Sequence, residues 1–207
     1  IKSTPLGQKV DQNEEFSGFE LRVNGVPVFC KGANWVPSEP FPSAEDNEKI
    51  TEILVLAKEA NLNMLRVWGG GIFERQHFYD ECDRLGIMVT QDMLMACGKY
   101  PDGEADFCEH MEKEAEYAAY KLRNHPCLMF WSGDNENAIA ANDNMPKYHG
   151  RKAVKGIIAK VMQKLDYNRR FLPSSPYGGI PYGSVTYGTA HNTQFLSSMF
   201  KYISTSD

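Results

Sequence analysis

Short apolar runs typical of buried strands alternate with amphipathic helical stretches along most of this chain, after an early hairpin signal at Asn24-Gly25. One strand and one helix together take roughly 25 to 40 residues, which is typical of a βαβ unit. Such units are right-handed and place their strands in one parallel sheet. We expect strands at residues 64–68, 87–92, 128–131 and 171–175, and helices at residues 45–60, 75–85, 104–124 and 146–165.

Polar or aromatic residues follow every expected strand. In parallel α/β architectures the carboxyl ends of the strands meet at one edge, where the loops carry the chemistry. A doubly wound sheet would place G-x-G-x-x-G after its first strand, and the glycine run 69–71 does not fit that spacing. We therefore predict an α/β fold of the (β/α)₈ TIM barrel class, with about five or six of its strands in this chain. The expected strand-end residues are Asn34, Trp35, Arg66, Trp68, Gln91, Asp92, Asn135, Glu136, Ser174 and Ser175.

The most informative strand, residues 128–131, consists of four consecutive large apolar side chains. Such a run, ended by Ser132-Gly133, is too short for a helix and predicts a strand buried on both faces. The segment that follows is polar and contains Glu136 beside Asn135. We therefore consider Glu136 the strongest candidate for proton transfer among the carboxylates of the sequence.

Composition excludes several classes of function. The 207-residue chain has a net charge of −5 and no lysine or arginine stripe, so we expect no nucleic-acid partner. No apolar stretch approaches the ~18 residues of a membrane helix, and no cysteine or histidine spacing indicates a metal or another cofactor. Residues 1–18 are polar and predict a linker or the tail of an upstream domain, ahead of one domain at residues 19–207. The first residues lack both Met and a signal-peptide core, so we do not expect Ile1 to be the natural start. We expect a cytoplasmic location, with a periplasmic or secreted one as the alternative.

The sequence WSGDNEN at residues 131–137 resembles the acid/base signature of the β-mannosidase-like branch of glycoside hydrolase family 2. Other segments follow that family's order, including RVWGGG at residues 66–71. The resemblance runs in register over residues 19–180. Its further segments are residues 23–29, 31–35, 78–83, 85–87 and 123–126.

The resemblance implies a retaining exo-glycosidase that cleaves terminal β-linked mannose. Glu136 would first protonate the glycosidic oxygen as the bond breaks, and would then deprotonate the water that releases the sugar. Asn135 would hydrogen-bond the sugar 2-hydroxyl. Arg66 would keep the nucleophile ionised and oriented through a charge-assisted pair.

Further residues are implied to surround the sugar. Trp68 and Trp35 would wall the pocket with flat apolar faces. Asp92 would bind a sugar hydroxyl or orient Arg66, and His191 is another candidate to line the site. Each has a structural alternative, which is barrel packing for the tryptophans and a structural ion pair for Arg66.

Departures from the family pattern leave the substrate open. Asp134 stands where the β-mannosidase-like branch commonly has Asn, and residues 186–192 stand where many relatives carry a tryptophan-rich segment. A family 2 hydrolase specific for galactoside or glucuronide is therefore one alternative. A non-catalytic carbohydrate-binding module, with Trp35, Trp68 and Trp131 as its sugar platform, is the other.

The catalytic pair is incomplete in this sequence. A retaining mechanism needs a second carboxylate about 5–5.5 Å from the first, and the sequence contains no Glu after Glu136. A complete (β/α)₈ barrel takes about 250 residues. We therefore expect a fragment of a longer enzyme, inactive alone, whose partners are a β-mannoside or related oligosaccharide, the upstream β-sandwich domains and the remaining barrel half. Its open strand edges also predict self-association.

Overall fold

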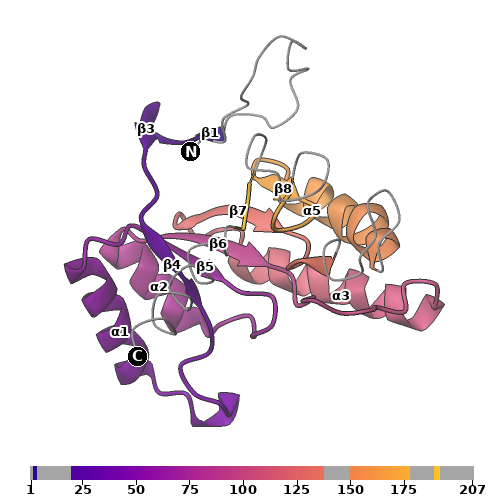
Figure 1. Cartoon of the computed structure of the whole chain (residues 1–207), viewed down its shortest axis with the longest axis horizontal. Helices are drawn as coiled ribbons and strands as arrows, with labels where there is room; N and C mark the ends of the chain where they lie inside the picture. Colours follow the sequence, from indigo (N-terminus) through magenta and orange to yellow (C-terminus); the bar gives the residue numbers. More distant parts are fainter. Residues whose placement is uncertain (1, 4–19, 138–149, 178–188, 192–207) are drawn as a thin grey trace, which may run out of the picture.

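A five-stranded parallel sheet forms the centre of the fold (Figure 1). The computed structural model describes residues 2–3, 20–137, 150–177 and 189–191. Neighbouring strands of the sheet are consecutive in the chain and parallel, so the predicted α/β fold with a parallel sheet is confirmed. The strands are β4 (Gly32–Trp35), β5 (Met64–Val67), β6 (Met88–Asp92), β7 (Leu128–Ser132) and β8 (Arg170–Leu172).

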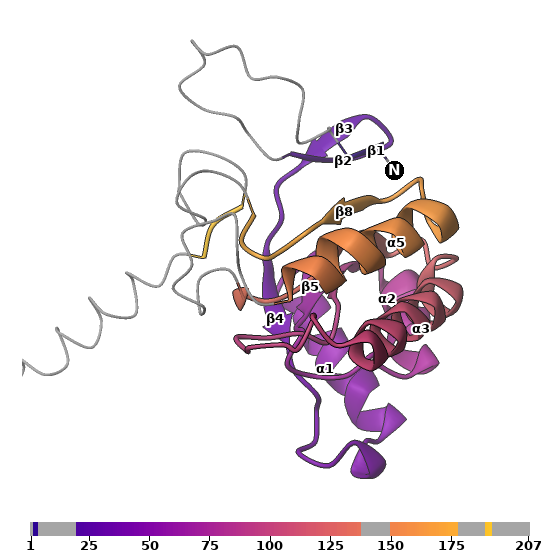
Figure 2. The ribbon, with the colours of Figure 1, turned by 90° about the vertical axis from the view of Figure 1, so that its right-hand side faces the viewer.

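Helices connect these strands and pack against one face of the sheet (Figure 2). Their positions agree with the predicted ones to within a few residues, except that residues 146–149 of the last predicted helix lie outside the described residues. None of the described helices is long and apolar enough to cross a lipid bilayer. The helical segments are the 3₁₀ turn η1 (Pro42–Ala44), α1 (Asn47–Glu59), α2 (Gln76–Leu85), α3 (Ala105–Leu122), and the π-helix η2 (Lys152–Ile158), which continues into α5 (Ala159–Leu165).

Local sequence signals explain where the helices begin and end. The Asp46 side chain caps α1 by accepting a hydrogen bond from the backbone N–H of Glu48 at 3.0 Å. Gly86 follows α2 with φ 68°, the left-handed conformation that glycine adopts without steric cost. In α3 the buried residues recur at helical spacing and form one stripe toward the core. They are Met111, Ala115, Ala118, Ala119 and Leu122.

The main hydrophobic core lies between the sheet and the helices. Strands β6 and β7 are buried along their whole length, as predicted for the second of them. Val89 and Leu128 contribute to this core, whereas the adjacent residues Met88 and Met129 belong to a smaller core that includes Leu21 of the hairpin. The central strands therefore bury both faces, which explains their continuous apolar sequence.

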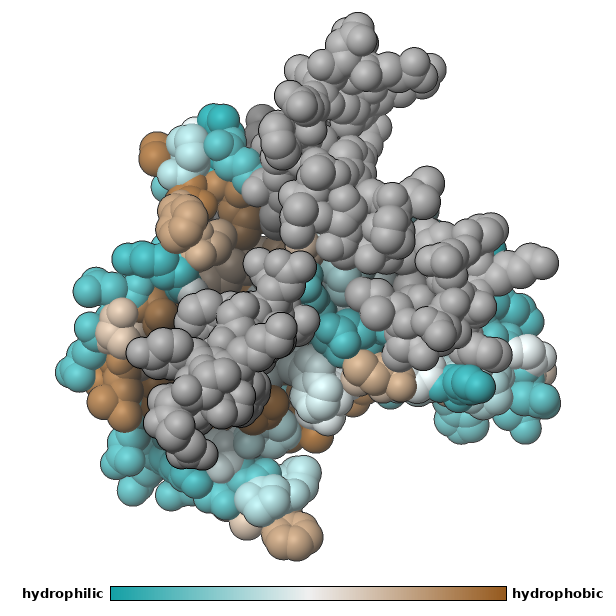
Figure 3. Space-filling view, in the orientation of Figure 1, coloured by the Kyte–Doolittle hydropathy of each residue, from teal (hydrophilic) through white to brown (hydrophobic). Residues whose placement is uncertain are grey.

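The predicted hairpin is present and packs against the smaller core. Its turn residues Asn24 and Gly25 both have positive φ, at 52° and 82°, as a tight two-residue hairpin turn requires. Val26 is 63% and Phe29 is 83% exposed, and apolar surface gathers over the hairpin at the upper left of Figure 3. The antiparallel strands are β1 (Lys2–Ser3), β2 (Leu21–Val23) and β3 (Val26–Val28).

A β-bulge interrupts the pairing of β6 with β7. Leu128 and Phe130 pair with consecutive residues of β6, so Met129 is an extra residue in β7. The bulge changes which face of the sheet the following side chains occupy. Phe130 lies in the smaller core, and Trp131 lies fully buried in the core beneath the helices.

We predict that Gly133→Ala destabilises the protein, because Gly133 follows β7 where the chain passes close to its neighbours. A Cβ atom there would lie 2.4 Å from Cγ1 of Val154 and 2.6 Å from the carbonyl oxygen of Pro173. Relieving this overlap should lower the free energy of unfolding by about 1–3 kcal/mol. Urea denaturation of Gly133→Ala beside Gly103→Ala, whose Cβ would meet nothing within 4 Å, checks it. Equal midpoints for the two variants would contradict the prediction.

Candidate active site

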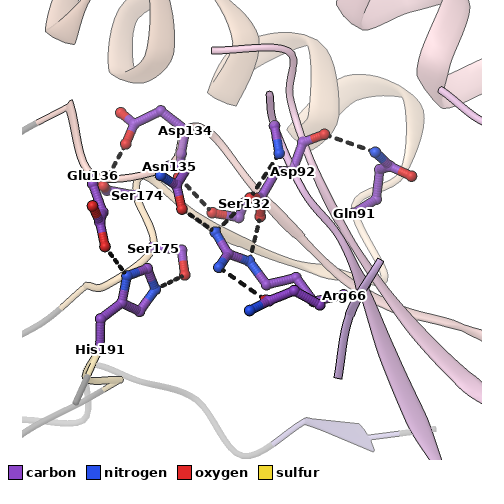
Figure 4. Close-up of polar contacts among 12 residues, drawn as sticks. Arg66, Gln91, Asp92, Ser132, Asp134, Asn135, Glu136, Ser174, Ser175 and His191 are labelled. Carbon is purple, nitrogen blue, oxygen red and sulfur yellow. Dashed lines mark hydrogen bonds and ion pairs between the residues drawn. The ribbon is translucent and has the colours of Figure 1, made fainter. Parts of the chain in front are cut away.

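Polar side chains from several strands meet at the carboxyl edge of the sheet (Figure 4). Beyond the ends of β6, β7 and β8 the segments stay paired, with Asn135 bridging Ala96 on one side and Ser175 on the other. The pairing with the segment after β8 keeps its register, and the pairing with the segment after β6 shifts by one residue. These bridges hold the segment after β7 between the segments that follow its two neighbours. The edge at which the sequence predicts the chemistry is therefore a fixed backbone framework.

Arg66 connects the residues at this edge. Its Nη2 donates to Oδ2 of Asp92 at 2.5 Å and to Oδ1 of Asn135 at 2.7 Å. Its Nε lies 3.3 Å from Oδ1 of Asp92, and its Nη1 lies 3.4 Å from Oδ1 of Asn34. One guanidinium thus orients side chains from β4, β6 and the segment after β7, using the planar fork of donors that only arginine offers.

Asp92 lies beneath Arg66 and is 1% exposed. Its Oδ2 also accepts a hydrogen bond from the backbone N–H of Gly69 at 3.1 Å. Burial raises the pKa of the Asp92 carboxyl above its ordinary value, while the charge of Arg66 and the Gly69 amide act in the opposite direction. Of the two roles predicted for Asp92, its contacts match the orientation of Arg66, since its side chain does not line the hollow described below.

Glu136 lies at the tip of the segment after β7, in an unusual backbone conformation. Its φ is 59°, a left-handed value that costs a residue with a side chain roughly 1–3 kcal/mol. Its N–H donates to the carbonyl of Ser175 at 2.9 Å, and its Oε1 lies 2.5 Å from Nδ1 of His191. The surrounding contacts therefore hold the carboxyl group in one orientation, with its side chain 32% exposed.

His191 and Cys97 flank the Glu136 carboxyl group. His191 is held from behind, because its Nε2 lies 2.9 Å from the hydroxyl of Ser175. The Cys97 thiol lies 3.6 Å from Oε2 of Glu136, and the Asn135 amide donates to Cys97 Sγ at 3.3 Å. Sequence reasoning missed Cys97, although its place five residues after Asp92 in the loop that follows β6 could have identified it.

A hollow of about 870 Å³ opens above these residues. Among the described residues that line it, Glu136 is the only carboxylate. Five of the seven predicted site residues line it, although their chemical roles stay predictions. These five are Arg66, Trp68, Asn135, Glu136 and His191.

The glycine run after β5 shapes one wall of the hollow. Trp68 is half-buried there, and a Cβ on Gly70 would lie 2.1 Å from its ring. Gly71 donates its N–H to the carbonyl of Trp68 at 3.0 Å and closes the turn. Glycine at position 70 therefore lets the backbone fold directly against the indole.

The prediction that Trp35 walls the pocket is wrong. Trp35 is 6% exposed, and its ring packs 4.7 Å from that of Phe78 beneath the helices. Side chains alternate along a strand, so Asn34 faces the hollow and Trp35 faces the opposite side. Trp131 cannot serve as a sugar platform either, because it is buried on the same side and donates its Nε1–H to Asp166 at 2.8 Å.

Three potential metal ligands, Asp83, His125 and Cys127, lie within 4.8 Å of one another away from this hollow. Their polar atoms already contact each other. The Asp83 carboxylate lies 2.6 Å from Nδ1 of His125 and accepts the backbone N–H of Cys127 at 2.7 Å. Burial raises the pKa of the Cys127 thiol, which disfavours the thiolate that a metal requires. This arrangement ties α2 to the turn before β7.

Comparison of the sequence and the structure with known proteins identifies proteins that are similar to this chain. No family model matches the chain. It is 39% identical to a β-mannosidase of Rattus norvegicus over 172 residues, which are 78% of this chain and 19% of that protein. The crystal structure of β-D-mannosidase from Dictyoglomus thermophilum is 40% identical, with a TM-score of 0.86 over 93% of this chain and 24% of that one. This chain is β-mannosidase-like.

The predicted resemblance to the β-mannosidase-like branch of glycoside hydrolase family 2 is therefore confirmed. The chain spans only 19% and 24% of the length of these two relatives. A similar fold also occurs in a protein of lower sequence identity. A β-glucuronidase structure from Parabacteroides merdae aligns with a TM-score of 0.60 at 19% identity, over 72% of this chain and 18% of that one.

We predict that Glu74 makes the stability of the protein depend on pH. Glu74 is fully buried, accepts the Trp35 indole N–H at 2.9 Å, and has its other oxygen without a hydrogen-bond partner among the described residues. Burial, together with the nearby Glu45 carboxylate, raises the pKa of Glu74 to about 7. The folded state therefore keeps a proton that the unfolded state releases above about pH 4.3. Stability should fall as pH rises toward 7, by at most about 4 kcal/mol from this group.

Glu74→Gln keeps an acceptor for Trp35 and cannot ionise, so its melting temperature should fall less between pH 5 and pH 8 than that of the unchanged protein. Glu109→Gln, on the exposed face of α3, is the control. The same pH dependence in Glu74→Gln as in the unchanged protein would show that Glu74 is ionised when folded.

Proposed function

We propose that this chain carries the acid/base part of the active site of a glycoside hydrolase that removes terminal β-linked mannose. One observation carries the proposal. Glu136 lines a hollow at the carboxyl edge of a parallel sheet, within a chain 40% identical to a β-D-mannosidase. The position, the contacts and the sequence similarity support the same assignment.

In this proposal Glu136 transfers a proton twice. As the general acid it protonates the glycosidic oxygen while the bond to the anomeric carbon breaks, so that the leaving group departs as an alcohol. As the general base it then removes a proton from the water that attacks the glycosyl-enzyme intermediate. The contact with His191 and the backbone bond to Ser175 support this role, because proton transfer needs a carboxyl group held in a fixed orientation.

The neighbours of Glu136 would bind the sugar. Asn135 accepts from Arg66 through its oxygen, which directs its amide group toward Cys97 and the hollow. That amide is a suitable donor to the sugar 2-hydroxyl, and such a bond strengthens in the oxocarbenium-like transition state. Arg66 orients Asn135 and would also orient the nucleophile. Trp68 offers an apolar face to the sugar ring.

The second carboxylate is proposed to come from a part of the parent enzyme outside this chain. The retaining mechanism requires it, and no other carboxylate among the described residues lines the hollow. The sheet is proposed to be the first part of a (β/α)₈ barrel, because its strands follow chain order without reversal and its helices cover one face. The remaining barrel half and the upstream domains would then cover the open strand edges.

A purely carbohydrate-binding role has little support in the geometry. The platform it requires consists of Trp35, Trp68 and Trp131, and two of these are buried beneath the helices. Only Trp68 of the three lines the hollow.

We predict that Glu136→Gln in the full-length parent enzyme abolishes turnover of unactivated mannosides. Loss of general acid catalysis should lower kcat by about 10²–10⁴-fold. Azide should partly restore turnover of an activated aryl mannoside, because it attacks the glycosyl-enzyme intermediate without a general base. Steady-state kinetics of this variant beside the exposed Glu109→Gln check the prediction. Unchanged kcat in Glu136→Gln would exclude the acid/base role.

The proposed sugar specificity is tested separately. Among nitrophenyl β-glycosides of mannose, glucose, galactose, glucosamine and glucuronic acid, the full-length enzyme should hydrolyse the mannoside with the highest kcat/KM. Preference for the galactoside or glucuronide would keep the glycosidase assignment and overturn the mannose assignment.

A further inference from the structure

Asp134 is a buried carboxyl group two residues before Glu136, and none of the roles above involves it. It is fully buried. Its Oδ1 accepts the hydroxyl of Ser174 at 2.5 Å and the backbone N–H of Asn137 at 3.3 Å. Figure 4 shows Asp134 directed away from Arg66, toward the helices, whereas Asn135 is directed at Arg66. The side chain of Asp134 therefore supports the Glu136 turn from behind.

The backbone of this turn is already joined to the segment after β8. The carbonyl of Asp134 accepts the N–H of Ser175 at 2.8 Å, and the N–H of Glu136 donates to the carbonyl of Ser175 at 2.9 Å. The bond from Ser174 to the Asp134 side chain adds a third link to that segment. The bond from Asn137 closes the turn on the far side of Glu136.

This bracing matters because Glu136 adopts a left-handed backbone conformation, which persists only where surrounding contacts enforce it. The Asp134 carboxyl group accepts one hydrogen bond from Ser174, in the segment after β8, and one from Asn137, the residue that follows Glu136. Removing it would leave a buried hydroxyl and a buried amide without their acceptor.

We propose that Asp134 is a positioning residue for Glu136, which locks the left-handed turn to the end of β8 through Ser174 and Asn137 and so aims the acid/base into the hollow. This inference rests on the proposed function of Glu136, and its test separates the two.

The environment of Asp134 favours its neutral form over its charged form below about pH 7. Burial raises its pKa to about 7, and the Asp92 carboxylate of β6 adds to this effect, while Lys155 of η2 and the bonds from Ser174 and Asn137 oppose it. Its Oδ2 is buried without a hydrogen-bond partner among the described residues, which suits a protonated oxygen better than a charged one. Asparagine has the same shape and the same accepting oxygen, so it should replace Asp134 in this role.

The leaving group of the substrate distinguishes positioning from stability. β-Linked mannobiose needs a proton on its departing oxygen, whereas 2,4-dinitrophenyl β-mannoside releases a stable anion without one. In the full-length parent enzyme, Asp134→Ala should lower kcat/KM for mannobiose at least about tenfold more than kcat/KM for the dinitrophenyl substrate, because kcat/KM reports the bond-breaking step and not the later hydrolysis of the intermediate. Asp134→Asn should recover the mannobiose activity that Asp134→Ala loses.

Three further variants make the outcome decisive. Asp166→Ala removes another buried carboxylate, which binds Trp131 and Arg169, and should lower activity on both substrates equally. Ser174→Ala should reproduce the selective loss in weaker form, and it replaces Asp134→Ala if that variant does not fold. Glu136→Gln should show the largest selective loss.

Equal losses on the two substrates in Asp134→Ala, or a failure of Asp134→Asn to recover mannobiose activity, would overturn the positioning role. If Glu136→Gln itself shows no selective loss, the proposed function fails. If Glu136→Gln shows it and Asp134→Ala does not, only the present inference fails.

The protonation state of Asp134 is tested separately, through the pH dependence of stability. A carboxyl group with a raised folded pKa lowers stability as pH rises from its unfolded value, about 4, to its folded value. Asp134→Asn cannot ionise and therefore does not lose stability in this way. Its melting temperature should fall less between pH 5 and pH 8 than that of the unchanged protein. If the two melting temperatures differ by the same amount at every pH, Asp134 is ionised in the folded protein. The argument that a neutral asparagine can replace it would then be overturned.

Discussion

The ion pair between Arg66 and Asp92 organises the carboxyl edge of the sheet. Both charges lie largely out of water, where each is tolerated only because the other is present. The pair spans β5 and β6, and the remaining donors of Arg66 extend it to Asn34 on β4 and to Asn135 after β7. Side chains from three other strand ends therefore share the guanidinium of Arg66. Loss of either charge would disturb the orientation of the others.

Much of this arrangement could be predicted from local sequence pattern. The strands and helices follow from apolar periodicity and from signals such as Asn24-Gly25 and Gly86, which act over a few residues. The convergence of Arg66 and Glu136 follows from a general property of parallel sheets. Neither prediction depends on how distant side chains pack.

The errors concern the face of the sheet on which a side chain lies. Trp35 ends β4, and proximity to the strand end suggested the pocket, whereas strand alternation places it beneath the helices. The orientation of Trp131 depends on the bulge, which the sequence does not reveal. Likewise, Cys97 contacts Glu136 and Ser174 contacts Asp134 only after separate strands have paired. The place of Cys97 in the loop after β6 could have identified it as a site residue, but it does not predict which side chain it contacts.

The bulge at Met129 also has a consequence for evolution. Because Met129 is the extra residue, its loss would let Leu128 and Phe130 pair consecutively with β6 and would leave Asn135 and its neighbours on the faces that they occupy now. Hydrophobic content would barely change, and the sheet could still assemble. Relatives that lack this one residue are therefore expected to keep the same side chains at the carboxyl edge, whereas a gain or loss elsewhere in the strand would turn those side chains to the other face.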